Sequence, residues 1–169
     1  IAVSGMTPQI VTETMYALAT NKVNPFIPTE IHLITTREGA DNAELNLFKK
    51  NKVGWFNLLC EELNLENIDF AVKNIHIISN HQTGKFLDDI RTTDDNEVTA
   101  NYITEFIREK CKDPNSALHV SIAGGRKTMG FYLAYALSLF GRKQDRLSHV
   151  FVDEKYESQP DFYFPMKHN

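Results

Sequence analysis

The stretch SIAGGRKTM, residues 121–129, decides the fold because it joins an apolar run to an amphipathic one. Residues 117–122 have the composition of a buried strand, and residues 128–140 show a helical pattern that ends at Gly141. Glycines between a strand and a helix permit close backbone approach, and the helix start offers free N–H groups. The stretch therefore predicts a strand, a tight turn and a helix, with an anion site at the turn.

The side chains of this turn add charge to the predicted anion site. Arg126 and Lys127 are cations at a helix N-terminus, where they oppose the macrodipole unless an anion binds, and Thr128 offers a hydroxyl as cap or phosphate donor. An ordinary turn would explain the glycines alone, but the cations favour a phosphate site. A P-loop is excluded, because an arginine interrupts its G-K pair and no upstream glycine is in place. The ligand-binding residues predicted here are Ala123, Gly124, Gly125, Arg126 and Thr128.

Strand and helix patterns alternate along the whole chain. Strand-like runs occupy residues 1–3, 30–36, 74–78, 117–122 and 149–152, and helical patterns occupy residues 9–19, 40–63, 97–112 and 128–140. This alternation predicts a single α/β domain over residues 1–169, a three-layer Rossmann-like fold with a mainly parallel central sheet. Ligands in such sheets bind at the carboxyl ends of strands, beside a topological switch point. Because the chain starts in mid-strand without methionine, we expect a few residues to precede it.

Polar residues follow the first two predicted strands. The candidate site residues of these two loops are Ser4, Gly5, Met6, Thr7 and Gln9 after the first strand, and Thr36 and Arg37 after the second. Their hydroxyl and amide groups suit a phosphate or a base, although Thr7 can equally cap its own helix. Arg37 suits a phosphate or a stacked adenine. The first loop lacks G-x-G-x-x-G, which argues against a dinucleotide dehydrogenase.

The polar connection at residues 79–96 is longer than most loops inside a compact domain, which predicts a functional segment. It contains His81 and Arg91, which we expect to reach a ligand, and Asp94 or Asp95 is expected to cap the helix that follows. Four further histidines fall in strand patterns, which favours packed imidazoles over catalytic ones. They are His32, His76, His119 and His149.

Charge and composition exclude several functional classes. The net charge of −4 excludes the basic surface that long nucleic acid requires, so any nucleic-acid ligand must bind in a local pocket. Cys60 and Cys111 lack the spacing of a disulfide or zinc site, which indicates free thiols in a reducing cytoplasm. No apolar run approaches the roughly 20 residues of a membrane span. We expect a cytoplasmic protein without metal or cofactor.

Four blocks of sequence resemble a family of CRISPR-associated Rossmann-fold (CARF) proteins linked to type III systems, including ring nucleases. The blocks are SGMTPQIVTETMYAL (4–18), EIHLITTREG (30–39), LDDIRTTDDNEVTANYI (87–103) and SIAGGRKTMGFYLAYALSLFGRKQDRLSHVFV (121–152). They cover nearly the whole chain in order, and the last is long and specific. The resemblance implies a homodimer that binds cyclic oligoadenylate, most of all cyclic tetra-adenylate, across its two-fold axis.

The resemblance also implies a reaction and its residues. A ribose 2′-hydroxyl attacks the adjacent phosphorus without metal, leaving a 2′,3′-cyclic phosphate and a free 5′-hydroxyl. Lys127 matches the family's pocket lysine and is expected to stabilise charge on phosphorus. Thr7 and Gln9 match first-loop positions that touch the ribose and the scissile phosphate. Residues 79–96 are expected to close over the ring as a lid.

Two other functions stay open on the sequence. One is a sensor domain that binds the ring without cutting it and regulates a fused or separate effector. The chain lacks the arginine and histidine spacing of the ribonuclease domain that many CARF proteins carry, which favours a standalone ring nuclease. The other is a monomeric enzyme that acts on a mononucleotide, for which the Gly-Gly-Arg-Lys loop alone would suffice.

Overall fold

A parallel β-sheet organises the computed structural model, which describes residues 1–50, 53–157 and 159–166. Within these ranges the sheet has five strands in the order β3-β2-β1-β4-β5, all parallel. The strands are β1 (Ala2–Val3), β2 (Leu33–Thr35), β3 (Ile75–Ile77), β4 (His119–Ser121) and β5 (Arg146–Ser148). The predicted α/β fold with a mainly parallel central sheet is confirmed. The strand order reverses between β1 and β4, which makes their carboxyl ends the topological switch point.

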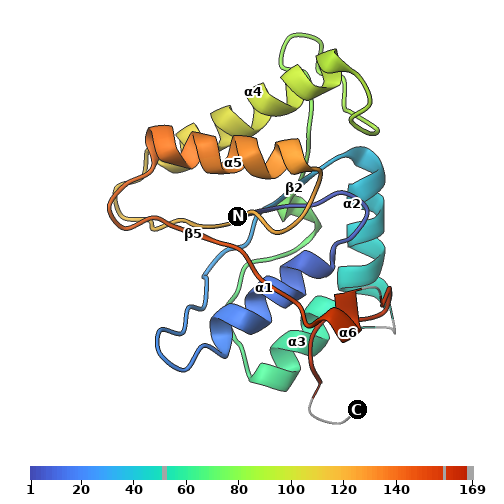
Figure 1. The fold of residues 1–169 in the computed structure, drawn as a ribbon, viewed down its shortest axis with the longest axis vertical. Helices are drawn as coiled ribbons and strands as arrows, with labels where there is room; N and C mark the ends of the chain where they lie inside the picture. The colour runs from blue at the N-terminus through green and yellow to red at the C-terminus, as the bar shows by residue number, and fades with distance from the viewer. Residues whose placement is uncertain (51–52, 158, 167–169) are drawn as a thin grey trace.

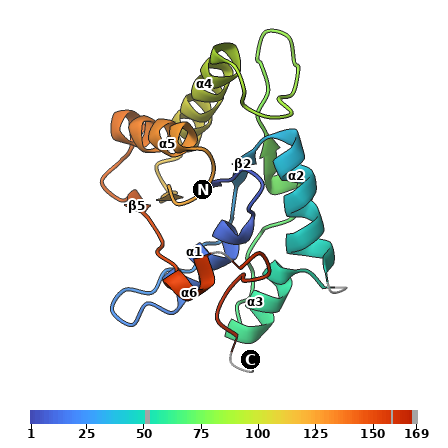
Figure 2. The same ribbon diagram turned by 45° about the vertical axis from the view of Figure 1, so that its right-hand side comes forward.

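Helices cover both faces of the sheet (Figures 1 and 2). They are α1 (Gln9–Ala19), α2 (Arg37–Glu44), α3 (Trp55–Leu63), α4 (Thr93–Lys110), α5 (Lys127–Phe140) and the short α6 (Glu154–Glu157), with a π-helical turn at Leu45–Lys49 and a 3-10 turn at Val72–Asn74. Helices α1 and α3 pack on one face, and α4 and α5 lie side by side on the other. No helix in the described ranges combines the length and the hydropathy that a membrane crossing requires.

The central strands β1 and β2 are buried on both faces because each face meets its own hydrophobic core. Successive side chains of a strand point to opposite sides. Ala2 and Leu33 therefore join the core beneath α1 and α3, whereas Val3 and Ile34 join the core beneath α4 and α5. The two-residue strand β1 lies at the centre of the sheet and is buried on both faces.

Four of the five predicted strands contain an observed strand, and the fifth prediction is wrong. The last strand is β5, residues 146–148, and not residues 149–152. Asp145 determines this position, because its buried carboxylate accepts hydrogen bonds from the Leu118 N–H (2.8 Å) and from Arg142 (2.9 and 3.0 Å). These bonds hold the turn before β5 against the start of β4. The chain then leaves the sheet after Ser148.

The packed role predicted for the strand histidines is confirmed for three of them. His32 Nδ1 and His76 Nε2 are 2.8 Å apart, and Lys110 Nζ is 2.7 Å from His32 Nε2. Burial, then the charge of His32, lowers the pKa of His76 to about 4. His119 hydrogen-bonds Ser148 Oγ at 2.8 Å. The prediction is wrong for His149, which lies outside β5 and is exposed.

The continuous helix predicted over residues 40–63 is wrong. Helix α2 begins earlier, at Arg37, its π-helical extension ends at Lys49, and α3 begins only at Trp55. Gly54, which precedes α3, has a φ of +86° that a residue with a side chain rarely adopts. Residues 51–52 of the predicted helix lie outside the described residues.

The N-terminus of α4 also differs from the prediction. The helix begins at Thr93 instead of residue 97, and its cap is Thr92, not Asp94 or Asp95. The Thr92 hydroxyl accepts a hydrogen bond from the Asp95 N–H, and the Asp95 carboxylate accepts one from the Thr92 N–H, which forms a capping box. The connection after β3 therefore ends at Thr92.

We expect Gly54→Ala to destabilise the protein more than Gly84→Ala. A Cβ at Gly54 would lie 2.2 Å from the Leu47 carbonyl oxygen, whereas a Cβ at Gly84, which also has a positive φ, meets nothing within 4 Å. The control measures backbone strain alone, about 1 kcal/mol, and the steric conflict should raise the loss in unfolding free energy to about 3 kcal/mol. Urea denaturation measures both losses. Equal losses would contradict the close packing around Gly54.

Candidate functional site

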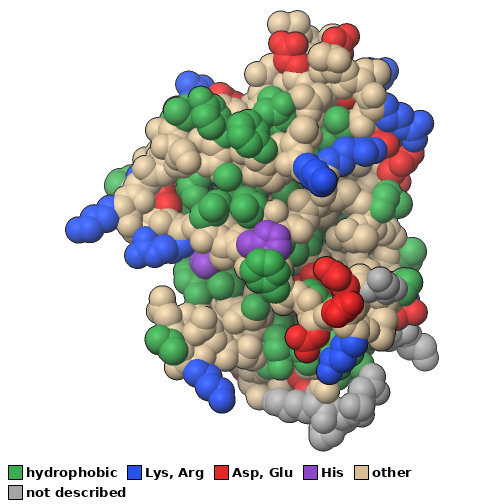
Figure 3. All heavy atoms as spheres, viewed as in Figure 1, with side chains coloured by type: hydrophobic (Ala, Val, Ile, Leu, Met, Phe, Trp, Pro, Cys, Tyr) green, Lys and Arg blue, Asp and Glu red, His purple; other side chains and the backbone are tan. Residues whose placement is uncertain are grey.

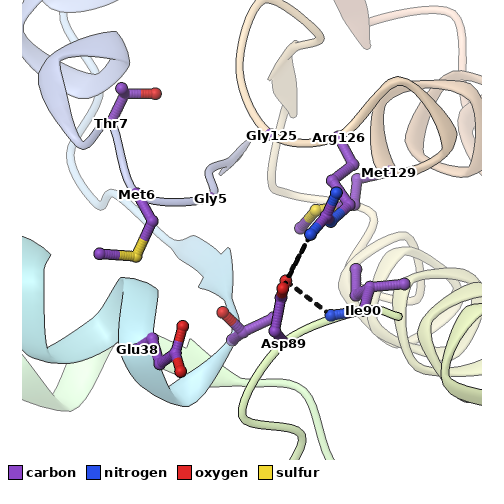
Figure 4. Close-up of a pocket in the computed structure, with 10 residues that line it drawn as sticks. Gly5, Met6, Thr7, Glu38, Asp89, Ile90, Gly125, Arg126 and Met129 are labelled. Carbon is purple, nitrogen blue, oxygen red and sulfur yellow. Dashed lines mark hydrogen bonds and ion pairs between the residues drawn. The ribbon is translucent and has the colours of Figure 1, made fainter. Parts of the chain in front are cut away.

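A pocket of about 260 Å³ lies at the carboxyl ends of the central strands (Figure 4). The loops after β1, β2 and β4 contribute to it, together with the segment before α4. Its lining residues are Gly5, Met6, Thr7, Thr36, Glu38, Asp89, Ile90, Gly125, Arg126 and Met129. The pocket is at the topological switch point, where the sequence predicted a ligand site.

Backbone packing at Gly124 determines the course of the loop after β4. A Cβ on Gly124 would lie 2.5 Å from the Val3 carbonyl oxygen at the end of β1 and 2.9 Å from Ile10 of α1. Gly125 then takes a φ of +76°. Gly124 requires glycine because the loop crosses directly over β1 before α5 begins, and Gly125 favours glycine because of its positive φ.

Helix α5 begins without a side-chain cap. Arg126 occupies the N-cap position in an extended conformation, and its side chain makes no capping hydrogen bond. Of the two roles predicted for Thr128, cap or phosphate donor, the cap is wrong, because Thr128 is the second residue of the helix. The first N–H groups of a helix have no partner within it, and residues 125–128 are exposed. The start of α5 therefore presents free N–H donors and partial positive charge to solvent.

Arg126 is held by a carboxylate on the far wall of the pocket. Its guanidinium donates to both oxygens of Asp89, at 2.9 and 2.8 Å, as Figure 4 shows. Asp89 also accepts bonds from Arg91 Nε at 3.1 Å and from the Ile90 N–H at 2.7 Å. The Arg126 hydrogen bond is the main cause that lowers the pKa of Asp89 to about 2, so the pair is ionised at neutral pH.

Lys127, the first residue of α5, is exposed and is not one of the residues that line the pocket. Among the residues that the structure describes, its ammonium has no hydrogen-bond or ion-pair partner. Its neighbour Arg126 is paired and it is not. Lys127 is therefore free to bind an anion that reaches the start of α5.

The first loop is only partly in the pocket. Gly5, Met6 and Thr7 line it, and the Thr7 hydroxyl does not cap α1, whose N-cap residue has no side-chain hydrogen bond. Ser4 is buried beneath the loop, and its hydroxyl has no partner among the described residues. Gln9 turns away, and its side-chain amide donates to the Pro160 carbonyl at 2.9 Å. Thr7 is thus the polar side chain of this loop that lines the pocket.

The loop after β2 divides between the pocket and the segment before α4. Thr36 lines the pocket and caps α2, with its hydroxyl oxygen 3.4 Å from the Gly39 nitrogen. Arg37 does not line the pocket, because its guanidinium pairs with Asp88 at 3.4 Å and lies over the ring of Phe86 at 4.9 Å. Arg37 therefore helps to hold the segment before α4 and does not contribute to the pocket lining.

The segment from Ile78 to Thr92, which includes most of the lid predicted at residues 79–96, is anchored to the rest of the domain. Leu87 and Ile90 insert into the core beneath α4 and α5, and Ser79 pairs with Phe86 in an antiparallel bridge. His81 does not line the pocket. It stacks on Tyr102 of α4, with the ring centroids 5.9 Å apart, and lines a separate groove.

The structure brings together six of the predicted site residues and separates the others. Gly5, Met6, Thr7, Thr36, Gly125 and Arg126 line the pocket; Ser4, Gln9, Arg37, His81, Arg91, Ala123, Gly124, Lys127 and Thr128 do not. Ala123, Gly124 and Gln9 instead line an adjoining groove, which also reaches Thr7. Arg91 contacts the pocket only through Asp89.

Sequence reasoning missed four residues of the pocket: Glu38, Asp89, Ile90 and Met129. Glu38 had a signal, because it directly follows two predicted site residues. Asp89 had none, because its partner Arg126 is distant in sequence and acidic loop residues are usually solvated. Within the described ranges, no three His, Cys, Asp or Glu side chains gather in a geometry that would hold a metal ion.

Comparison with known proteins identifies one family. A search of curated proteins finds no match. The model of the family described as CRISPR-associated protein NE0113 (Cas_NE0113) matches residues 7–169, which include the loops after β2 and β4 and the end of the loop after β1. This chain therefore belongs to the CRISPR-associated NE0113 protein family.

Proposed function

We propose that this protein is a ring nuclease that binds cyclic oligoadenylate, above all cyclic tetra-adenylate, and cleaves it without metal, which switches off type III CRISPR antiviral signalling. The loop of residues 123–128 carries the proposal, because glycine backbone, free helix N–H groups and two cations meet there at the switch point of the sheet. Membership of a CRISPR-associated family supports the biological setting. The resemblance to CARF ring nucleases supports the ligand.

One internucleotide phosphate of the ring would bind at the start of α5. The free N–H groups of this helix and the Lys127 ammonium, which has no partner in the described part of the chain, suit a phosphate diester, which carries one negative charge. Thr7, across the pocket, offers a hydroxyl for a second phosphate oxygen or for the ribose. A local site of this kind is compatible with the net charge of −4.

The reaction we propose needs geometry and charge stabilisation more than a strong nucleophile. The ribose 2′-oxygen forms a bond to phosphorus, the bond from phosphorus to the 5′-oxygen breaks, and the leaving oxygen gains a proton. Negative charge on the non-bridging oxygens grows in between, and Lys127 with the helix N–H groups would stabilise it. The carboxylate of Glu38, which lines the pocket, is the group that we propose to accept the 2′-hydroxyl proton.

Ring binding would also change the partner of Arg126. A phosphate that enters the pocket competes with Asp89 for the guanidinium, because both are anions that accept paired hydrogen bonds. The pair is half-exposed at Arg126, so it stabilises the empty pocket only weakly. Arg126 is then available to a ligand at a small energetic cost.

We further propose a homodimer whose interface includes the outer face of α5. Phe131, Tyr135 and Leu139 follow one another at intervals of four residues and are 62%, 54% and 56% exposed. Figure 3 shows hydrophobic side chains gathered over this helix. An apolar stripe on a helix usually meets a partner, and α5 starts at the phosphate loop. A two-fold partner on α5 would offer the loop twice to a two-fold symmetric ring.

The first test is Lys127→Ala with cyclic tetra-adenylate in EDTA, followed by mass spectrometry of the products. The wild type should yield linear di-adenylate ending in a cyclic phosphate, and the variant should be slower by about 10²-fold, as expected for loss of a charged transition-state contact. Lys143→Ala, an exposed lysine after α5, is the control. Wild-type turnover in the variant removes Lys127 from the mechanism, and an intact ring that co-elutes with the wild type identifies a sensor.

Asp89→Asn should bind the ring more tightly than the wild type. The substitution removes the carboxylate charge that pairs with Arg126, and an exposed pair is worth up to about 1 kcal/mol, which corresponds to about fivefold in affinity. Asp88→Asn is the matched control, because its partner Arg37 lies outside the pocket. Calorimetric titration measures both. Weaker binding by Asp89→Asn would mean that the pair positions Arg126 for the ligand.

Tyr135→Arg should convert the dimer to a monomer without unfolding it. A charge in the middle of the apolar stripe would be buried without a partner in the interface, which costs several kcal/mol. Light scattering after size-exclusion chromatography gives the mass. Val23→Arg, at a residue that is 94% exposed and outside α5, serves as the control and should stay dimeric. A dimeric Tyr135→Arg would exclude α5 from the interface.

A further inference from the structure

A second hollow adjoins the pocket on the other side of the glycine loop. It has a volume of about 380 Å³ and lies between α1 and the chain that follows β5. Thr7 lines both hollows, and the loop after β4 divides them, with Ala123 and Gly124 facing the groove and Gly125 and Arg126 facing the pocket. A nucleotide with its phosphate at this loop therefore has its base within reach of the groove.

Aromatic side chains form one wall of the groove. Phe151 is 88% exposed, and the His149 ring lies beside it, with the ring centroids 4.7 Å apart. Tyr156 and Phe162 stack on each other at 4.3 Å with an angle of 7° between their planes. All four line the groove. An exposed phenylalanine at the edge of an aromatic hollow is a platform on which a planar base can stack.

Helix α1 contributes a carboxylate to the lining of the groove. Glu13 of α1 lines the groove, and no hydrogen bond or ion pair engages its side chain among the residues that the structure describes. Burial raises its pKa to about 6, so partial removal from water disfavours its charge. A carboxylate only accepts hydrogen bonds, so a ligand that satisfies it must bring an N–H or O–H donor.

The charge of the groove favours a base over a phosphate. Glu13 and Glu157 line it, and Figure 3 shows acidic side chains beside the histidines and hydrophobic residues of this face. Negative charge here would repel a phosphate, which the cations at the start of α5 would attract. Adenine is neutral, flat and carries a 6-amino donor, which matches a groove lined by aromatic side chains and a hydrogen-bond acceptor.

We propose that this groove is an adenine-binding subsite, in which the base stacks on Phe151 and His149 and donates its 6-amino group to Glu13. The inference rests on the proposed function, because the phosphate at the start of α5 determines where the base can lie. Phe151 supplies affinity and Glu13 supplies selectivity for adenine. The aromatic residues alone would accept any base, since every base has a stacking face.

The test titrates the full chain with two rings of four 2′-deoxynucleotides, which lack the attacking hydroxyl and stay intact. One ring carries adenine, and the other carries purine without the 6-amino group. The wild type should bind the adenine ring about tenfold more tightly, as expected for a hydrogen bond to a charged acceptor. Glu13→Leu should bind both rings within about twofold, whereas Glu61→Leu, an exposed glutamate of α3, should behave as the wild type.

Two further variants separate recognition from folding defects. Glu13→Gln keeps the shape and adds a donor, so it should gain affinity for a ring with hypoxanthine bases, which present a 6-oxo acceptor. A folding defect cannot produce that gain. Phe151→Ala should bind both original rings about tenfold more weakly than the wild type and should remain dimeric. Phe86→Ala, outside the groove, should bind both rings as the wild type does.

The outcomes distinguish this inference from the proposed function. A wild type that binds the adenine and purine rings equally, or a Glu13→Leu variant that still discriminates between them, overturns the adenine subsite while ring binding stands. A monomeric Phe151→Ala assigns that ring to the dimer interface and overturns its stacking role. A wild type that binds neither these rings nor the ribose ring overturns the proposed function and this inference with it.

Discussion

The contact between the backbone of Gly124 and the end of β1 is the constraint on which the site depends. The loop after β4 passes so close to the Val3 carbonyl oxygen that a single Cβ would collide with it. This approach places the start of α5 over the centre of the sheet, where the loops after β1 and β4 diverge. The pocket on one side of the glycines and the groove on the other share this origin. A shift of this loop would change both hollows together.

Charge pairing distinguishes the four cations near the pocket. Arg37, Arg91 and Arg126 are engaged by two neighbouring aspartates of the segment before α4, and Lys127 is without a partner among the described residues. Arg37 and Arg126 therefore tie this segment to the loops after β2 and β4, Arg91 pairs within the segment, and the lysine stays available. Side chains that look equivalent in the sequence thus differ in whether an anion must displace a carboxylate to reach them, as it must at Arg126 and need not at Lys127.

Local signals in the sequence predicted much of the fold. The strand–helix alternation, the parallel sheet, helix α1 at residues 9–19 and the ligand-binding edge of the sheet all follow from apolar periodicity and turn residues. The wrong predictions concern elements whose position depends on contacts between residues that are distant in sequence. The apolar run at residues 149–152 resembles a strand, but the Asp145 hydrogen bonds to Leu118 and Arg142 place β5 at the less apolar residues 146–148. Edge-strand register depends on such contacts, which no local pattern contains.

The site residues also divide into those that local sequence signals predicted and those that distant contacts position. Six predicted residues that follow strands directly line the pocket, because strand ends meet at one edge in a parallel sheet. Residues of the segment before α4 were predicted poorly, since its position depends on Leu87 and Ile90 entering the core and on ion pairs that span many residues. His81 was expected at the ligand and instead stacks on Tyr102.

The bond between Arg126 and Asp89 makes the segment before α4 a reporter of what occupies the pocket. Thermodynamic linkage is reciprocal. An anion that competes for the arginine weakens the arginine–aspartate bond, and that bond weakens the binding of the anion by the same factor. The empty and filled pockets would then differ in how firmly this segment is held, although Leu87 and Ile90 keep it in the core. A ligand in this small polar pocket would thereby change how well ordered the segment before α4 is at the surface of the molecule.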